Sequence, residues 1–297
     1  MKARFWGTRG SIPVSLTASD VRRKLVAALR TIREGGRWPG TDAEVHHCVE
    51  ALGFELAGTY GGHSSCVEIE AGDDRIVCDL GSGARALGQS MLERFGPGRP
   101  RTYHVFLSHV HWDHIMGFPF FAPSYIPGNR IVIHGCHREL EAAFRRQHGA
   151  PSFPVDFDAL GAKIEFDVIP AGETREVAGF SVRAMKQRHA GDSYGWRFER
   201  GGKVLVYSTD SEHRLEDAAE MTAFADFFRD ADLVIFDAMY SLADAVTDER
   251  GSDDEQRGDP PKQQRLRRSR RRTAPQVDSV GEVAREEEDP RGCHQAE

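Results

Sequence analysis

The residues best suited to chemistry stand in one short stretch of the chain. The segment Ser108-His-Val-His-Trp-Asp-His114 holds three imidazoles and a carboxylate directly after an expected strand. Alternation along an extended chain places His109 and His111 on the same side, and a following turn can bring Asp113 and His114 back toward them. Nitrogen and oxygen donors suit borderline divalent ions such as zinc. A lone histidine is more often structural, but four donors at this spacing predict a metal site.

Composition excludes several classes of protein. The chain has 297 residues and a formal net charge of −7, so no overall field attracts nucleic acid or anionic lipid. Its start does not resemble a signal peptide, and no later run approaches the ~20 apolar residues that span a bilayer. The five cysteines form no Cys-x-x-Cys pair. We therefore expect reduced thiols, no membrane segment and a cytoplasmic location.

The segments around the histidines alternate between short strands and helices. This alternation predicts layered sheets with helices outside them, an α/β fold. Helices are expected at 84–95, about 138–147 and 214–229. Strands are expected at 4–6, 67–70, 75–79, 103–108, 131–133, 163–169, 176–185, 194–199, 203–208 and 233–236.

Residues 17–58 interrupt this pattern with two expected helices. Ser19 is a candidate cap for the first, and Thr41 with Glu44 forms a capping-box pattern before the second. Each helix has one apolar stripe, which favours docking onto the rest of the chain. A lid over the site and a contact between two copies of the chain, as in a homodimer, are the alternatives.

The composition changes at about residue 248. Residues 249–297 carry 11 basic and 12 acidic side chains and no aromatic residue. Such a segment cannot bury enough apolar surface to offset its ordering entropy, so we expect a disordered tail. Its basic run at 262–272 fits a solvated charged segment better than an arm for an acidic partner. The predicted folded domain is therefore 1–248.

The order of motifs resembles the metallo-β-lactamase superfamily, and within it the phosphodiesterase branch that includes ribonuclease Z and the cyclic-phosphate phosphodiesterases. The signature His-x-His-x-Asp-His stands at 109–114. Residues 5–13 resemble the opening strand and loop of that branch, and 78–83 resemble its Asp-x-Gly turn. Residues 60–68 resemble its second strand entry, although His63 stands where Asn is more usual. The resemblance implies a four-layer αββα sandwich, with residues 17–58 as an insertion.

The resemblance also implies a set of metal ligands for two divalent ions, with zinc favoured and manganese as the alternative. His109, His111 and His189 would hold the first ion. Asp113 and His114 would hold the second, and Asp210 would bridge the two. Taken from the residues alone, Asp210 could equally cap the helix expected near 214.

The function implied is hydrolysis of a small phosphodiester or cyclic nucleotide by a dinuclear site. A metal-bound hydroxide would attack, oriented by Asp113, and His213 is the candidate proton donor to the leaving group. His213 could instead be an exposed residue at a helix start. Asp79 and Asp237 are candidates to fix ligand imidazoles by hydrogen bonding. A thioester or lactam hydrolase, and a metal-binding domain without activity, are the alternatives.

Two departures from the family pattern qualify this function. The family places a Gly-His-Ser/Thr segment and a final ligand histidine after the strand near 237. Here only His294 follows, without a strand around it, so the last fold layer and the second metal site are expected to be incomplete. We hypothesise a shifted reading frame after residue 247. In addition, only 20 residues separate His189 from Asp210, where ribonuclease Z-like proteins carry a tRNA-binding arm, so a nucleic-acid partner is not expected.

Overall fold

The computed structural model describes residues 1–236 apart from 37, 73 and 213–216, and leaves out the side chains of residues 71 and 74. The described elements belong to one compact unit, and the predicted boundary at 248, the tail, Asp237 and His294 lie outside the described residues. The elements are β1 (Lys2–Gly7), α1 (Ala18–Glu34), α2 (Asp42–Glu50), α3 (Phe54–Ala57), β2 (Cys66–Ala71), β3 (Asp74–Cys78), α4 (Ala84–Phe95), β4 (Thr102–Phe106), α5 (Trp112–Ile115), β5 (Arg130–Gly135), α6 (Leu140–Arg146), β6 (Lys163–Val168), β7 (Thr174–Val177), β8 (Phe180–Gln187), β9 (Ser193–Arg200), β10 (Lys203–Ser208), α7 (Ala218–Phe228) and β11 (Leu233–Phe236), with short 3-10 turns between α5 and β5 and before β6.

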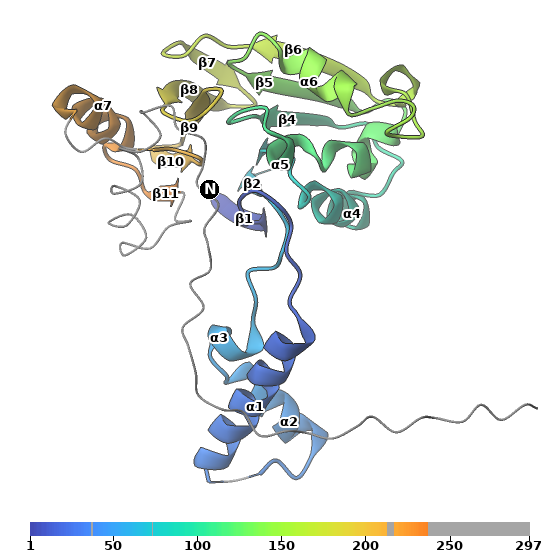
Figure 1. Ribbon diagram of the computed structural model, residues 1–297, viewed down its shortest axis with the longest axis vertical. Helices are drawn as coiled ribbons and strands as arrows, with labels where there is room; N and C mark the ends of the chain where they lie inside the picture. The colour runs from blue at the N-terminus through green and yellow to red at the C-terminus, as the bar shows by residue number, and fades with distance from the viewer. Residues whose placement is uncertain (37, 73, 213–216, 237–297) are drawn as a thin grey trace, which may run out of the picture. The chain divides into compact units, whose positions relative to one another are not determined.

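The strands form two sheets (Figure 1). The first has the order β1-β2-β3-β4-β5-β6; β1, β2 and β3 pair antiparallel, and β3 to β6 pair parallel. The second has the order β11-β10-β9-β8-β7, with only β10 and β11 parallel. Parallel strands gather their carboxyl ends at one edge of a sheet, where α/β proteins commonly place their sites.

Two apolar cores hold four layers together. Residues of α4 and α6, such as Leu87 and Phe144, pack with Val105 of β4 on one face of the first sheet. Phe106, on the other face of β4, packs with Trp196 and other residues of the second sheet. Helix α7 covers the outer face of that second sheet. The expected αββα sandwich is therefore confirmed for the described part of the chain.

Two arginines of the second sheet contact α7. The guanidinium carbon of Arg183, on β8, lies 5.6 Å from the centre of the Phe227 ring. Arg197, on β9, donates hydrogen bonds to the backbone carbonyls of Phe227 and Arg229. These contacts fix α7 on the sheet. Any further element of this layer would fall in 237–297, outside the described residues.

Most expected elements are present, but two expectations were wrong. The strand expected over 176–185 is two strands, β7 and β8, joined by Ala178 and Gly179, whose φ values of 50° and 73° fit a tight hairpin turn. The insertion holds three helices rather than two, since Phe54–Ala57 forms a short third helix. Helix α4 was expected with its observed bounds.

The first helix of the insertion is capped by Thr17 rather than Ser19. Thr17 accepts a hydrogen bond from the Asp20 backbone N–H, and the Asp20 carboxylate accepts one from the Thr17 N–H. Thr41 caps α2 as expected, whereas Glu44 contacts the Gly40 N–H rather than that of Thr41. The apolar stripe of α1 remains about half exposed, as at Leu25, which is 60% exposed. The described structure does not bury this stripe as docking would require.

His134, on β5, makes the stability of the fold depend on pH. It is 3% exposed, its Nδ1 lies 2.9 Å from Asp167 Oδ2, and its ring stacks on Phe106. Burial, opposed by the hydrogen bond with Asp167, lowers the pKa of His134 from 6.5 to about 4. As the pH falls below 6.5 the unfolded chain therefore takes up this proton before the folded chain does, and stability is lost until about pH 4.

We expect this histidine to contribute about 2 kcal/mol to the fall in unfolding free energy between pH 7 and pH 5. Urea unfolding at both pH values measures it. H134Q should remove that part of the pH dependence, whereas H46Q, at an exposed position of α2, should not. An identical pH dependence in wild type and H134Q would contradict the assignment.

Candidate metal centre

The histidine cluster lies where the chain leaves β4 at the carboxyl edge of the first sheet. Beyond Phe106 the chain passes through a loop into the short helix α5, which carries Asp113 and His114. The Leu80 N–H donates to the carbonyl of His114, and the Gly117 N–H donates to that of Leu80. These bonds tie the loop to the Asp-x-Gly turn. His109 and His114 are each only 1% exposed, whereas His111 is exposed.

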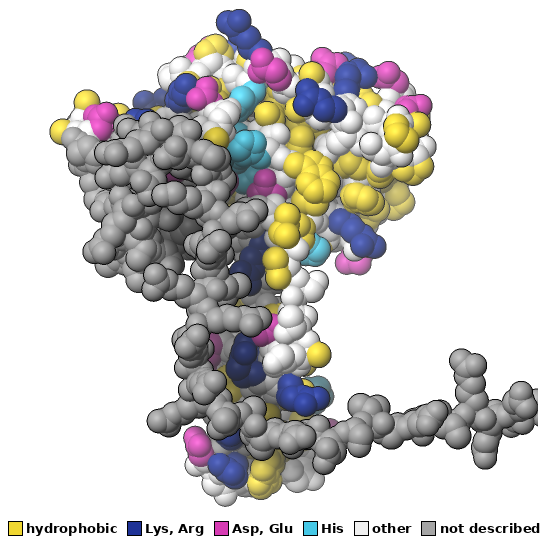
Figure 2. All heavy atoms as spheres, viewed as in Figure 1, with side chains coloured by type: hydrophobic (Ala, Val, Ile, Leu, Met, Phe, Trp, Pro, Cys, Tyr) yellow, Lys and Arg dark blue, Asp and Glu magenta, His cyan; other side chains and the backbone are white. Residues whose placement is uncertain are grey.

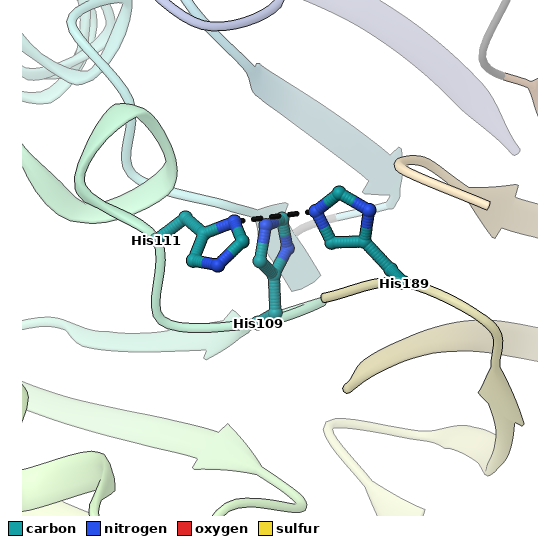
Figure 3. Close-up of side chains that lie close together, drawn as sticks. All are labelled: His109, His111 and His189. Atoms are coloured by element: carbon teal, nitrogen blue, oxygen red, sulfur yellow. Dashed lines mark hydrogen bonds between the residues drawn. The ribbon is translucent and has the colours of Figure 1, made fainter. Parts of the chain in front are cut away.

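Three imidazoles meet from two distant segments (Figure 3). His189 follows the end of β8, and the turn after it is tight because Gly191 and Asp192 have φ values of 79° and 63°. Its Nε2 lies 3.2 Å from Nδ1 of His111, and its ring centre lies 5.0 Å from that of His109. The potential ligand atoms of these three histidines all lie within 4.8 Å of one another.

Asp210 joins a second group at the same place. It comes two residues after β10 in a left-handed conformation, with φ of 45°. Its carboxylate oxygens lie 3.2 Å from His114 Nε2, 3.9 Å from His109 Nε2 and 3.6 Å from His189 Nε2. His109, His114 and Asp210 therefore form a second group of potential ligands. The alternative role for Asp210 is not observed, because Asp217 caps α7.

The structure describes only some of the remaining predicted site residues. Asp113 Oδ2 lies 3.4 Å from His114 Nε2, but Asp113 belongs to neither of the two groups. His213 and Asp237 lie outside the described residues. His63, the departure from the family pattern, lies 3.1 Å from the Ser82 hydroxyl through Nδ1. Which of these residues bind metal, and in which position, stays a prediction.

Asp79 contacts the predicted ligand His114 directly and His109 through Ser108. Its carboxylate lies 2.7 Å from His114 Nδ1, 2.8 Å from both the backbone N–H and the hydroxyl of Ser108, and 2.7 Å from the Tyr207 hydroxyl. Ser108 Oγ, having donated to Asp79, accepts the proton of His109 Nδ1 at 3.0 Å. His109 is thereby held in the tautomer that presents an unprotonated Nε2, the form that binds metal, and His114 would present its Nε2 in the same way on release of the proton there.

The sequence indicated Asp79 but not its hydrogen-bond partners, Ser108 and Tyr207. Tyr207 is fully buried and its contact with Asp79 spans 128 residues of sequence. A buried phenol three residues before a predicted ligand is the signal that could have found it, since buried tyrosine hydroxyls need a polar partner.

The electrostatics of the cluster favour neutral His109 and His111 and an ionised Asp210. Burial, followed by the charge of His114, lowers the pKa of His109 from 6.5 to about 2. Burial and His189 lower the pKa of His111. Burial tends to raise the pKa of Asp210, but the hydrogen bond and charge of His114 lower it to about 2. Burial likewise opposes the charge of Asp79, which raises the pKa of His114 well above its usual value.

These residues fit a divalent cation. The Nε2 atom of His109 is buried and has no hydrogen-bond partner within the described ranges, and that of His114 faces the carboxylates of Asp113 and Asp210. Buried polar atoms of this kind ordinarily have a partner, and a metal ion supplies one. Three carboxylates, those of Asp79, Asp113 and Asp210, also converge on the single imidazole of His114, so a divalent charge would offset theirs. Figure 2 shows histidine side chains that reach the surface of the body beside acidic and apolar side chains.

The fold and this donor set define the class of metallo-β-lactamase-fold, metal-dependent hydrolases. A model of the family described as "Beta-lactamase superfamily domain" matches residues 74–279, more than half of the chain. The chain belongs to this superfamily. The match runs beyond residue 248, into residues that lie outside the description.

The curated relatives that match are ribonuclease Z sequences, in agreement with the branch inferred from the motifs. Ribonuclease Z of Bradyrhizobium diazoefficiens is 33% identical over 141 residues, which cover 44% of this chain and 42% of the relative. Ribonuclease Z of Natronomonas pharaonis is 29% identical over 140 residues, covering 45% of this chain and 41% of the relative. The chain thus spans less than half the length of these relatives.

Solved structures with similarity include the metallo-β-lactamase fold protein YhfI from Bacillus subtilis, with a TM-score of 0.41 and 20% identity over 59% of this chain and 64% of that one. A diphosphatase from the PhnP family has a TM-score of 0.42 and 18% identity, covering 63% and 69%. The short form of human tRNase Z has a TM-score of 0.43 and 19% identity, covering 63% and 76%. Among the described helices, none combines the length and apolar character needed to cross a bilayer.

Proposed function

We propose that this protein is a metal-dependent phosphodiesterase that hydrolyses a small phosphodiester or cyclic nucleotide, with two divalent ions, zinc or else manganese. The observation that carries the proposal is the pair of ligand groups that share His109 and lie together around Asp210. When bound in these groups, such cations would supply stabilisation of the charge that develops at phosphorus and would make water a nucleophile at neutral pH.

Different residues would bind the two ions, orient the attacking water and donate a proton. His109, His111 and His189 would hold the first ion, Asp113 and His114 the second, and Asp210 would be shared by the two. The ionised Asp113 and Asp210 would also accept hydrogen bonds from the attacking water and fix its orientation. His213 remains the candidate proton donor, and it lies outside the described residues.

A small substrate is proposed because the connection between His189 and Asp210 is short. Its 20 residues are accounted for by β9, β10 and the turns beside them, and hold no further helix or arm. The competing substrate is RNA, favoured by the names of the ribonuclease Z relatives. We further propose that the hydrolase domain is 1–248 and that it works in the cytoplasm, where Cys48, Cys66, Cys78 and Cys136 would stay reduced.

Turnover of bis(p-nitrophenyl) phosphate by the purified full chain tests the proposal. We expect turnover with added zinc or manganese, loss of it after exhaustive chelation, and recovery when metal is restored. A nitrophenyl thioester should react more slowly. Full turnover after chelation would contradict a metal-dependent reaction, and a faster thioester reaction would favour the other hydrolase class.

The RNA alternative is tested by the same preparation. We expect no electrophoretic retardation of tRNA at physiological salt, because the chain is acidic overall. Tight, salt-sensitive tRNA binding together with cleavage of a tRNA precursor would replace the small substrate by RNA.

A further inference from the structure

A polar cavity lies at the opposite end of β4 from the histidine cluster. It has a volume of about 170 Å³ and is lined by Arg75, Phe95, Arg101, Thr102 and His104, among others. Arg101 and Thr102 stand at the amino end of β4, whereas His109 follows its carboxyl end. No residue that lines this cavity belongs to either group of potential metal ligands.

The Phe95 ring gathers three guanidinium groups. The guanidinium carbons of Arg101, Arg75 and Arg94 lie 3.9, 4.7 and 5.2 Å from its centre. An aromatic face attracts each cation, but it does not offset the repulsion among three of them. The arrangement therefore requires negative charge nearby.

Two buried or partly buried carboxylates contact this group of arginines. Glu68 is fully buried and lies 2.9 Å from Arg94 and 3.5 Å from Arg75. Glu70 lies 2.8 Å from Arg94 and 3.7 Å from Arg4. Neither carboxylate lies within ion-pair distance of Arg101.

Arg101 forms no ion pair with either of these carboxylates. Among residues whose side chains are described it has no carboxylate partner, and its Nε is buried without a hydrogen-bond partner. The Arg101 side chain as a whole is half-buried, but a buried N–H donor is costly unless an acceptor reaches it. The unmet donor belongs to a side chain that lines the cavity, so the missing acceptor can come from a ligand there.

We propose that this cavity binds a small tetrahedral oxyanion, such as a phosphate group. Guanidinium forks match the spacing of phosphate oxygens and bind them through charge-assisted hydrogen bonds. Thr102 and His104 are further polar residues that line the cavity. The volume equals that of about five or six water molecules, enough for a group of five heavy atoms. This site is separate from the proposed hydrolytic site and needs no metal.

Titration calorimetry of the full chain with inorganic phosphate tests the proposal, after chelation and dialysis have removed metal. We expect saturable binding that R101Q weakens at least about tenfold, because two charge-assisted hydrogen bonds are lost. R145Q is the matched control and should bind as the wild type does. Arg145 also stacks on a phenylalanine, Phe157 at 4.5 Å, but it is paired with Glu141 and Asp158.

Three results would overturn the site. One is equal phosphate binding by R101Q and wild type. Another is phosphate binding that disappears when metal is removed, which would place it at the histidine cluster. The third is acetate binding as tightly as phosphate and sulfate, which would exclude selectivity for a tetrahedral oxyanion. If R101Q does not fold, R101K and T102V replace it: each should weaken binding at least about threefold, and unchanged binding in both would overturn the proposal.

Discussion

The substitution H109A is expected to lower kcat/KM for bis(p-nitrophenyl) phosphate by roughly 10³-fold or more, because a bound cation contributes several kcal/mol to the transition state. His109 is the one residue common to both groups of potential ligands. Its loss should therefore empty the first position and weaken the second. Elemental analysis of the purified variant measures this directly as fewer bound ions per chain than in the wild type.

The control for H109A is H148A. His148 is also a buried histidine, 8% exposed, but it makes edge-to-face contacts with the rings of Phe118 and Phe157 and belongs to neither ligand group. H148A should lose stability while it keeps the metal content and, once folded, the activity of the wild type. Unchanged zinc content in H109A would refute the assignment of the first metal position. Metal loss in both variants would mean that general unfolding, rather than a missing ligand, explains the result.

The parts of the site that could be predicted are those formed by residues close together in the sequence. His109 to His114 lie within six positions, so their proximity depends on one loop and one short helix. The bounds of α4 were also predictable, since a Gly-Ser-Gly turn precedes it and Gly96, with φ of 70°, ends it. In both cases neighbouring residues determine the outcome, and tertiary packing does not override them.

The parts that could not be predicted depend on contacts between distant segments. The hairpin at 178–179 was missed because an alanine occupies a left-handed position that usually signals itself by glycine or asparagine. The stack of Arg101 on Phe95 depends on how β4 lies beside the end of α4, which no local pattern specifies. The apolar stripe of α1 predicted an amphipathic helix correctly, but not whether that stripe would be buried.

The substitution D79N should weaken metal binding about 10- to 100-fold and lower the unfolding free energy by about 3 kcal/mol or more. The backbone tolerates the change, because Asp79 has φ of 57° and asparagine also accepts that conformation. The side chain does not tolerate it. Four donors from Ser108, Tyr207 and His114 converge on the carboxylate. An amide NH₂ would face at least one of these donors, and His114 would lose the charge that orients it.

The substitution Y207F separates the charge of Asp79 from the general loss of one buried hydrogen bond. It removes one donor to Asp79 and one contact with Ser65, but leaves the carboxylate and its contact with His114 intact. Its expected cost is about 1–2 kcal/mol, with metal affinity close to that of the wild type. Competition with a chromophoric chelator measures the affinity, and urea unfolding measures the stability. If both variants lose metal to the same extent, the ligands depend on the whole buried network. If only D79N loses metal, the carboxylate itself holds His109 and His114 in the orientation that binds metal. Asp79 contacts His114 directly and His109 through Ser108, which explains why one buried acid affects both metal positions.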